Sequence, residues 1–483
     1  MNVLLLSNSA PNYFHFFNAL AQCFAKDGAK VTVAVDSTFS REENGLNKLG
    51  YDVYDFSTHH AAHQINHAIL KKYSDFDLNG ALLSDFERAE VYNIWGSDIG
   101  IEFYDRLKSA LLSYFEEIFE RYSIDVVIYE NVSNAFAHFS LFVAQKKGAR
   151  YCGIGGSRLP GRFSVTDDPL ADDATFNAFN AIRNGQLDVS PEVRQSTAEY
   201  ISKIETVVPD YMKVNGLDRV GLIKRYLRRD RLYKLRSLIR HVLDSRTSAF
   251  QIGNPLHTHL NLFMRNVRRR LKTGWVRRLY QEPVKGEQFL LYPMHFHPES
   301  STSILAGTYL DEYEVIRNIA FSLPEGVRLY VKDHVSAWGY PTLEFYRRIR
   351  RLPNVRLLGP NAPTKQLIKA SAGVITLTST VGYEALLLKV RVFLYGQVFY
   401  GFHKGVVRIE NPAKLRETLL LGMAKPVNWD DAYNNYFVFA YHYATLPGSL
   451  NLMQGSCEAA LTAQRVYEEM LRANCFYASS SGI

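Results

Sequence analysis

From residue 288 to residue 396 the chain alternates short apolar runs with amphipathic segments, and this pattern constrains the fold more than any other feature. The apolar runs are about four to six residues long and the segments between them have a helical period, which is typical of a parallel sheet wound with helices. Open sheets of this kind bind ligands beyond the carboxyl ends of their strands. We therefore expect a binding site where the polar residues that follow these runs gather.

One group of these polar residues suits an anion. Ser379, Thr380 and Gly382 stand between an apolar run at 374–377 and a helix that is expected to open at Tyr383. Backbone N–H groups and hydroxyls at a helix N-terminus form a cradle for phosphate. The alternative is that the two hydroxyl residues are an ordinary helix N-cap.

Charged groups at the other run ends complete a candidate nucleotide-sugar site. Lys332 and His334 end the run 327–331 and would add positive charge near the phosphates. Glu384, placed in the first turn of its helix, would accept hydrogen bonds from ribose hydroxyls or simply complement the helix dipole. The first run of the region adds four more candidate donor-binding residues, which are His295, His297, Glu299 and Ser300.

Three segments of this region, YPMHFHPESSTS, the stretch from 323 to 360, and TLTSTVGYEALLLKVRVFLYGQVFY, resemble the capsule polysaccharide biosynthesis family of bacterial glycosyltransferases, which includes the β-Kdo transferases. The N-terminal half resembles the family only loosely. The family commonly has proline after the Lys-x-His motif, and this chain has Val335 there. The resemblance implies a GT-B-like fold, a CMP-activated acidic sugar with Kdo as first choice, and a capsule or lipopolysaccharide glycan as acceptor.

The length, composition and cysteine pattern suit a cytosolic protein of more than one domain. A chain of 483 residues with 47% hydrophobic and 22% charged residues is too long for one globular core. Its four cysteines, Cys23, Cys152, Cys457 and Cys475, are scattered without metal-ligand spacing, which indicates reduced thiols and no metal site. The N-terminus reads as a first strand without the features of a signal peptide, and no apolar stretch is long enough to span a bilayer.

The N-terminal half begins like a Rossmann-like domain, with strands expected at 3–6, 31–35 and 53–56. The turn after the first strand lacks the G-x-G-x-x-G fingerprint, so it does not predict a dinucleotide site. That turn can instead shape an acceptor site or simply cap an aromatic helix. Its candidate acceptor-binding residues are Asn8, Asn12 and His15.

Catalytic candidates lie further along this half. Glu130 ends the apolar run 125–129 and would face an interdomain cleft, where a carboxylate can act as base or acid, or merely cap the next helix. The segment 155–173 is rich in Gly, Pro and Asp and is predicted to be a loop. Its Asp168-Pro169 pair resembles an Asp-Pro element of the capsule-type Kdo transferases, which implies that Asp168, or its neighbour Asp167, is a nucleophile in a retaining reaction.

Two arginines of the same segment, Arg158 and Arg162, suit an acidic sugar or a phosphate, or are simply solvated. Residues 219–280 are far more basic, with seventeen Lys and Arg against two acids, which is +15 in a chain of net charge +8. Apolar residues recur there at helical spacing, which suits an anionic membrane surface or an acidic glycolipid. Nucleic acid is disfavoured because the chain carries no recognisable nucleic-acid-binding module.

These observations predict an α/β, GT-B-like protein with two Rossmann-like domains facing a cleft. The predicted segments are an acceptor and catalytic domain at 1–185, a basic helical insertion at 186–285, a nucleotide-sugar domain at 286–425 and bracing helices at 426–483. The predicted enzyme needs no cofactor or metal beyond its nucleotide sugar and works in the cytoplasm, on the inner face of the membrane. The alternatives are a UDP-sugar transferase, a glycerol-phosphate transferase and a non-catalytic scaffold.

Overall fold

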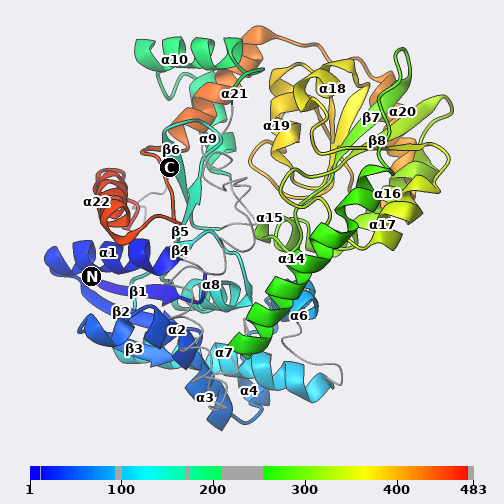
Figure 1. The fold of residues 1–483 in the computed structure, drawn as a ribbon. Coiled ribbons are helices and arrows are strands. Elements are labelled where there is room, and N and C mark those ends of the chain that lie inside the picture. The colour runs from blue at the N-terminus through cyan, green and yellow to red at the C-terminus, as the bar shows by residue number, and fades with distance from the viewer. Residues whose placement is uncertain (11, 93–99, 169–172, 208–253, 477–483) are drawn as a thin grey trace. The chain divides into compact units, whose positions relative to one another are not determined.

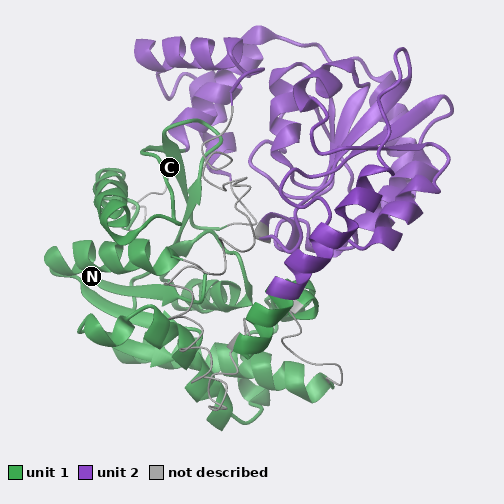
Figure 2. Ribbon diagram, viewed as in Figure 1, with its two compact units in different colours: residues 1–169, 209–262, 445–483 green, residues 170–208, 263–444 purple. Residues whose placement is uncertain are grey.

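The computed structural model describes residues 1–10, 12–92, 100–168, 173–207 and 254–476. Within it the chain forms two compact units, which are coloured separately in Figure 2. Unit 1 comprises residues 1–169, 209–262 and 445–483, and unit 2 comprises residues 170–208 and 263–444. Each unit is built around one β-sheet (Figure 1).

The sheet of unit 1 has seven strands in the order β13-β6-β5-β4-β1-β2-β3. Strands β1 to β5 pair in parallel, and β6 and β13 extend the sheet in antiparallel pairing. The central strands are apolar because helices cover a parallel sheet on both faces. The strands of unit 1 are β1 (Asn2–Ser7), β2 (Lys30–Val35), β3 (Asp52–Asp55), β4 (Val126–Glu130), β5 (Arg150–Gly156), β6 (Arg162–Thr166) and β13 (Leu446–Pro447).

The sheet of unit 2 is parallel throughout, with six strands in the order β12-β11-β10-β7-β8-β9. This order places the first strand beside the fourth, as in a Rossmann fold, and so creates a topological switch point between β7 and β10. The strands of unit 2 are β7 (Gln288–Pro293), β8 (Val327–Lys332), β9 (Val355–Leu358), β10 (Gly373–Thr376), β11 (Val392–Leu394) and β12 (Val406–Arg408).

The helices of unit 1 pack on their sheet in two groups. Helix α1 lies on β1 and β2 with α22 beside it, and α8 lies on β4 and β5 in contact with α7 (Figure 1). The helices of this unit are α1 (Tyr13–Lys26), α2 (Thr38–Glu43), η1 (Leu46–Lys48), α3 (Phe56–Ala62), α4 (His67–Lys72), α5 (Leu78–Leu83), α6 (Phe86–Tyr92), α7 (Ile101–Tyr122), α8 (Ala135–Lys147) and α22 (Ser456–Arg472).

In unit 2, α16 packs on β8, α17 and α20, while α18 and α19 cover the strands β10 and β11 from the other side of the sheet (Figure 1). The helices of this unit are α9 (Ala174–Arg183), α10 (Pro191–Ser202), α15 (Ser300–Ser303), η3 (Gly307–Tyr309), α16 (Glu312–Ser322), α17 (Leu343–Arg350), α18 (Thr364–Ala370), α19 (Thr380–Leu387), η4 (Pro412–Lys414), α20 (Leu415–Ala424) and α21 (Asp431–Tyr443).

A long helix, α14 (Pro255–Arg277), carries the described part of the basic segment. Its last turns belong to unit 2, because Val276 is fully buried in the same core cluster as Leu290 and Ile316. Residues 219–253 of the predicted basic insertion lie outside the described residues, and so does most of the predicted membrane-binding surface.

The two sheets confirm the predicted α/β class with two Rossmann-like halves. The compact units divide the chain at other positions than the predicted segments do, since α9 and α10 pack on α21 inside unit 2. Of the helices predicted at 426–483, α22 packs on α1 in unit 1, where β13 also pairs with β6, whereas α21 packs on α9 and α10 in unit 2.

Two local predictions were wrong. The segment 155–173 was predicted to be a loop, yet β6 forms within it, where Phe163 pairs with Gly156 of β5. β5 and β6 pair antiparallel through a turn that contains Gly and Pro. Because these residues are typical of loops, the composition of the segment did not predict the strand. The second error concerns α19, which begins at Thr380 rather than Tyr383, so that Glu384 lies beyond its first turn.

Candidate functional site

The site forms at the carboxyl edge of the six-stranded sheet, around the switch point between β7 and β10. The two strands are hydrogen-bonded neighbours, with Leu291 opposite Val374. After β7 the chain continues to β8, toward one edge of the sheet. After β10 it continues to β11, toward the other edge. Where neighbouring strands diverge in this way, open α/β sheets bind their ligands in a crevice beyond the strand ends.

His295 lies just after β7 and ties this strand to the end of β10. Its Nε2 lies 3.2 Å from Oγ1 of Thr376 and accepts a hydrogen bond from the backbone N–H of Thr378 at 3.4 Å. Its Nδ1 lies 3.4 Å from the carboxylate of Glu312. Both ring nitrogens thus have protein partners, and His295 holds the crevice together rather than presenting a free ring to a donor.

His297 meets the other oxygen of the same carboxylate. Its Nε2 lies 2.5 Å from Oε2 of Glu312, while the backbone N–H of His295 donates to Oε1 at 3.1 Å. Burial alone raises the pKa of Glu312, but interactions with His295 and His297 outweigh burial and hold it well below its usual range. The carboxylate therefore stays ionised, and it fixes the orientation of both imidazoles.

Lys332 ends β8 beside the crevice. It is buried, and its Nζ donates a hydrogen bond of 3.0 Å to the backbone carbonyl of Pro360, in the turn after β9. Burial lowers its pKa, while the adjacent Asp333 opposes this shift. The amino group is thus held at the strand ends by a neutral carbonyl.

The next two residues are also buried or half-buried. Asp333 accepts hydrogen bonds from the hydroxyl of Tyr280 at 2.6 Å and from the backbone N–H of His334 at 2.7 Å. Burial raises the pKa of Asp333 to about 6. Burial, together with the nearby His295 and Lys332, lowers the pKa of His334 to about 4, so this imidazole is neutral at physiological pH. His334 therefore adds no positive charge to the site, contrary to the prediction.

Ser379 is the N-cap of α19, in agreement with the simpler interpretation of the sequence. Its Oγ accepts a hydrogen bond from the N–H of Val381 at 3.2 Å, and its own N–H donates to Oγ1 of Thr376 at 3.1 Å. Thr380 is the first residue of the helix. The N-terminus of α19 therefore opens at the switch point, where its dipole favours an anion.

Gly382 has a packing role in the first turn of α19. A Cβ atom at this position would lie 2.6 Å from the hydroxyl of Tyr400, which donates a hydrogen bond of 2.6 Å to the carbonyl of Ser379. The N–H of Gly382 also donates to the Ser379 carbonyl. The glycine thus lets a tyrosine approach and fix the turn, and its N–H already has a partner within the protein.

The remaining predicted donor residues differ in how they are held. Glu384 is largely buried and pairs with Nζ of Lys365 on α18 at 3.0 Å. The exposed Glu299 accepts hydrogen bonds through its backbone carbonyl from the hydroxyls of Thr302 and Ser303. Ser300 is the first residue of the short helix α15.

In unit 1, the predicted acceptor residues follow β1. Asn8 accepts the N–H of Ala10 through its Oδ1 at 2.9 Å, which makes it part of a tight turn. Asn12 has a left-handed backbone, with φ of 67°, and donates from its side chain to the carbonyl of Met453. The His15 ring is tilted against that of Phe14 in the first turn of α1, and burial lowers its pKa. Asn8 and Asn12 precede this helix, and both have structural partners.

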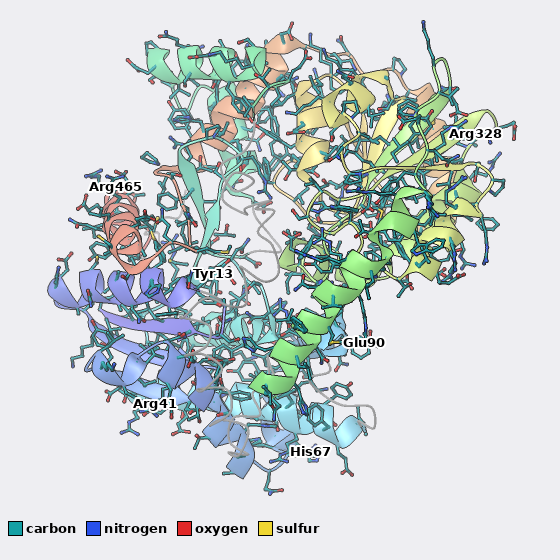
Figure 3. The ribbon with its side chains drawn as sticks, in the orientation of Figure 1. Tyr13, Arg41, His67, Glu90, Arg328 and Arg465 are labelled. Carbon is teal, nitrogen blue, oxygen red and sulfur yellow. The ribbon has the colours of Figure 1, made fainter. Side chains whose placement is uncertain are left out.

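Glu130 ends β4 at the carboxyl edge of the seven-stranded sheet. Its Oε1 accepts a hydrogen bond of 2.5 Å from the hydroxyl of Ser133. Burial raises its pKa, while hydrogen bonds from Ser133 and from Tyr13, which Figure 3 labels at the start of α1, oppose the shift. A carboxylate with a raised pKa at a strand end is suited to proton transfer near neutral pH.

Asp167 and Asp168 follow β6. The exposed Asp167 accepts the backbone N–H of Asp168 through its Oδ1 at 3.0 Å. His138 on α8 is buried near Asp168, and neither of its ring nitrogens has a hydrogen-bond partner within the described part of the chain. Burial lowers the pKa of this histidine to about 4, although Asp168 opposes the shift. Asp168 therefore lies beside a neutral imidazole.

The two predicted arginines lie on either side of the tight turn before β6. Arg158 is half-buried. Arg162 donates from its Nε to Oγ1 of Thr445 at 2.8 Å and from its Nη2 to the Thr445 carbonyl. Since Thr445 immediately precedes β13, Arg162 stabilises the antiparallel edge of the sheet. The prediction that this arginine binds an acceptor therefore has a competing structural explanation.

Sequence reasoning missed Glu312 and Asp333. Glu312 is the first residue of α16, where an acid needs no ligand to explain it because it complements the helix dipole. Its burial is due to two histidines that lie 15 and 17 residues earlier in the chain. Asp333 stood between two singled-out residues, and its partner Tyr280 lies 53 residues away. A signal for Asp333 was available, because an acid directly after an apolar strand often lies in a site.

The fold and this edge define a class, namely an α/β protein of two Rossmann-like units with polar groups gathered at the switch point of a parallel sheet. Residues 230–431 match the family model described as capsule polysaccharide biosynthesis protein. The match includes the three segments on which the resemblance to this family was based. No curated protein matches the chain.

Several solved structures are similar to the chain. The β-Kdo 2,4 transferase of Thermosulfurimonas dismutans KpsC has 14% sequence identity over 67% of this chain and 81% of that chain, with a TM-score of 0.37. The β-Kdo 2,7 transferase of the same protein has 8% identity over 80% and 96%, with a TM-score of 0.37. The glycotransferase of kitacinnamycin has 12% identity over 98% of both chains, with a TM-score of 0.26.

Within the described residues, no helix combines the length and the apolar character that crossing a bilayer needs.

Proposed function

We propose that the chain is a glycosyltransferase whose nucleotide-sugar donor binds at the carboxyl edge of the six-stranded sheet. One observation carries the proposal, namely a chain of hydrogen bonds that crosses four adjacent strand ends. Lys332 at the end of β8 donates to the Pro360 carbonyl after β9, and its own carbonyl accepts the N–H of Met294 after β7. His295 then accepts the N–H of Thr378 after β10. A merely structural sheet edge needs only the backbone groups of this series and not the buried side chains of Lys332 and His295.

The donor phosphate would bind between Lys332 and the N-terminus of α19. Both are positive, and a leaving phosphate gains negative charge as its bond to the sugar breaks. If His297 is protonated, its Nε2–H donates to the ionised Glu312 and its Nδ1–H would donate to the same phosphate. The family match and the HPESST and STVGYEA motifs support a CMP-activated acidic sugar, with Kdo as first choice, added to a capsule or lipopolysaccharide glycan.

The transfer chemistry would fall to the carboxylates of unit 1. In a retaining reaction, a carboxylate oxygen of Asp168 forms a bond to the anomeric carbon as CMP leaves with the bonding electron pair. The acceptor hydroxyl then displaces the aspartate and gives its proton to a base. Glu130 suits this second role because burial raises its pKa toward the working pH.

A thermal-shift panel of CMP, CDP, UDP, GDP and ADP tests the donor assignment, because a ligand that binds only the folded state raises the melting temperature. Selective stabilisation by CMP supports the proposal. A preference for UDP or CDP replaces the donor by a UDP-sugar or a glycerol-phosphate donor. No response to any nucleotide makes the non-catalytic scaffold the better explanation.

Replacing Lys332 by Met sharpens the test, because Met keeps the apolar stem of the side chain and removes only the charge. We expect CMP to bind about tenfold more weakly, which corresponds to about 1.4 kcal/mol. Lys369→Met is the matched control, since Lys369 on α18 is exposed and pairs only with Glu205. Equal CMP affinity in the two variants would remove Lys332 from the site.

We also propose an anionic membrane surface as a partner of the basic segment at 219–280. The described part of that segment, α14, exposes the apolar side chains of Leu271 and Trp275 beside its arginines, with exposed fractions of 75% and 57%. Binding to vesicles of anionic but not zwitterionic lipid, lost when Leu271 is replaced by Gln, would support this partner. Leu421→Gln on α20 is the control, because Leu421 is equally apolar and 65% exposed.

A further inference from the structure

A cavity of about 450 Å³ opens in unit 2 between the start of α16 and the end of β11, apart from the donor edge. Its volume is within the range of small-molecule sites, which is roughly 300–1,000 Å³. None of the predicted donor residues lines it. The residues that do are Thr308, Tyr309, Asp311, Glu314, Val315, Arg317, Asn318, Phe321, Tyr395 and Pro412.

The walls of the cavity are aromatic. The rings of Tyr309 and Tyr395 meet edge to face, with centroids 4.8 Å apart. Phe321, on the last turn of α16, is 76% exposed, which is unusual for so large an apolar side chain. Exposed aromatic faces beside a polar hollow suit the C–H faces of a sugar ring, which are apolar while the ring edge is polar.

The polar groups of the cavity can bond to hydroxyls. Oδ1 of Asn318 and the hydroxyl of Tyr395 are buried, and neither has a hydrogen-bond partner within the described part of the chain. Tyr395 as a whole is only 6% exposed. Buried polar atoms are normally paired, so two unpaired ones beside one cavity point to a ligand or water that supplies the bonds. Thr308 adds a side-chain donor and Asp311 an acceptor.

The charge of the lining excludes a second phosphate site. Asp311 and Glu314 are acids, and Arg317 is already paired with Glu314 at 2.5 Å. Asp311 is the N-cap of α16 and accepts the N–H of Glu314 at 3.0 Å, so it is held in place as a carboxylate that would repel a phosphate or a sugar acid but not a neutral polyol. This lining therefore differs from the donor edge, where Lys332 and the N-terminus of α19 favour an anion.

We infer that this cavity is a binding site for a neutral saccharide. The site is separate from the donor edge but mechanically linked to it, since Asp311 and Glu314 flank Glu312 on the first turn of α16. A saccharide that bonds to Asp311 or Glu314 therefore contacts the same helix turn that orients His295 and His297. The inference goes beyond the transferase proposal and holds whether or not the chain transfers a sugar.

Saturation-transfer NMR tests the site on the full chain without nucleotide. The probes are methyl β-glucoside, methyl β-galactoside, N-acetylglucosamine and, as a cationic comparison, glucosamine. We expect transfer to at least one neutral sugar, and about fivefold to tenfold weaker binding in the variants Phe321→Ala and Tyr309→Ala, which each remove an aromatic wall. Phe321 is on the surface, so its replacement does not endanger folding.

Two controls make the result specific. Tyr436→Ala removes a half-exposed tyrosine of α21 that does not line the cavity, and Lys332→Met disables the donor edge. Both should bind the sugar as the wild type does. Three results would overturn the inference. They are no saturation transfer to any neutral sugar, wild-type saturation transfer in the Phe321→Ala and Tyr309→Ala variants, and selective binding of glucosamine. The CMP panel is independent of these outcomes, so either proposal can fail alone.

Discussion

Nε2 of His297 lies 2.5 Å from Oε2 of Glu312, and this contact joins the loop after β7 to the first turn of α16. The carboxylate is buried, so its charge needs compensation from the protein. His297 supplies it from one side and His295 from the other. The relationship makes Glu312 a positioning residue for the donor edge, although it reaches the crevice only through the histidines.

Replacing Glu312 by Gln tests this role. The neutral amide keeps the shape but presents an N–H₂ group to one of the two histidines, so one buried hydrogen bond is lost. We expect the free energy of unfolding to fall by about 1–3 kcal/mol in urea denaturation. We also expect weaker CMP binding in calorimetry, because His297 loses its fixed orientation.

Glu314→Gln on the same helix is the matched control for that variant. Glu314 is half-exposed and pairs with Arg317 and, at 3.6 Å, with Arg348. Exposed pairs of this kind contribute about 0–1 kcal/mol. If Glu312→Gln were no less stable than Glu314→Gln, the buried network would have no positioning role.

The sequence predicted the strands of this region well, because central parallel strands are continuous apolar runs. Residues 327–331 were expected as a strand and β8 is Val327–Lys332. The ends of these strands also indicated the switch point, since topology follows from the alternation of strands and helices. Lys332 and Ser379 could therefore be placed at one edge of a sheet from the sequence alone.

Partners that are distant in the chain could not be predicted. Glu384 was predicted to bind ribose from its expected place in the first turn of the helix, yet Nζ of Lys365 lies 3.0 Å from its carboxylate. Gly382 was assigned to the anion cradle, whereas its small size serves Tyr400, 18 residues later. Such pairings depend on how α18, α19 and the loop after β11 pack together, and no local pattern carries that information.

Gly382→Ala should destabilise the start of α19. The new methyl group would lie 2.6 Å from the Tyr400 hydroxyl, so the ring must move and its hydrogen bond to Ser379 is weakened. We expect a loss of about 1–3 kcal/mol in the free energy of unfolding. Gly274→Ala on α14 is the control, because its Cβ meets open space and alanine favours the helix by about 1 kcal/mol.

A second variant tests the cause of that loss. Tyr400→Phe removes the hydroxyl that the methyl group would strike. The double variant should therefore lose less stability than the sum of the two single variants, by about 0.5 kcal/mol or more. Strict additivity would show that the alanine acts through the backbone and not through Tyr400.

His403 makes the stability of unit 2 depend on pH. The ring is 1% exposed, its Nε2 lies 3.0 Å from Oδ1 of Asn434, and its Nδ1 accepts the N–H of Gly405. Burial, helped by the neighbouring Lys404, lowers its pKa to about 4, although the bond to Asn434 opposes the shift. The unfolded chain therefore takes up a proton at this residue before the folded protein does.

The sign of the effect follows directly. Stability from the neutral ring is fully present above the unfolded pKa of about 6.5 and is lost as the pH falls toward 4. Between about pH 7.5 and pH 5, urea denaturation should show that the wild type loses about 2 kcal/mol more than His403→Gln, which cannot titrate. Comparing the two pH slopes cancels the contributions of the other histidines. If the two pH slopes were parallel, His403 would take up its proton at the same pH in the folded and the unfolded chain.

The last prediction separates the two carboxylates of unit 1. If Glu130 is the base, Glu130→Gln should lower the rate of transfer by about 10²–10⁴ and leave CMP affinity unchanged. A base works only when it is ionised, so the acid side of the wild-type rate profile should lie at higher pH than for an ordinary glutamate, because burial raises the pKa of Glu130. If Asp168 is the nucleophile, mass spectrometry should detect a glycosyl adduct on it when the donor is present without acceptor.

The variants give opposite results for that adduct. Glu130→Gln should still form it, and should accumulate more of it, because the blocked step is the attack of the acceptor hydroxyl. Asp168→Asn should form none, while Asp167→Asn serves as the control for a neighbouring exposed acid. An adduct on Asp167 would move the nucleophile by one residue. Full transfer activity in all three variants would instead show that the catalytic groups are not Glu130, Asp167 or Asp168.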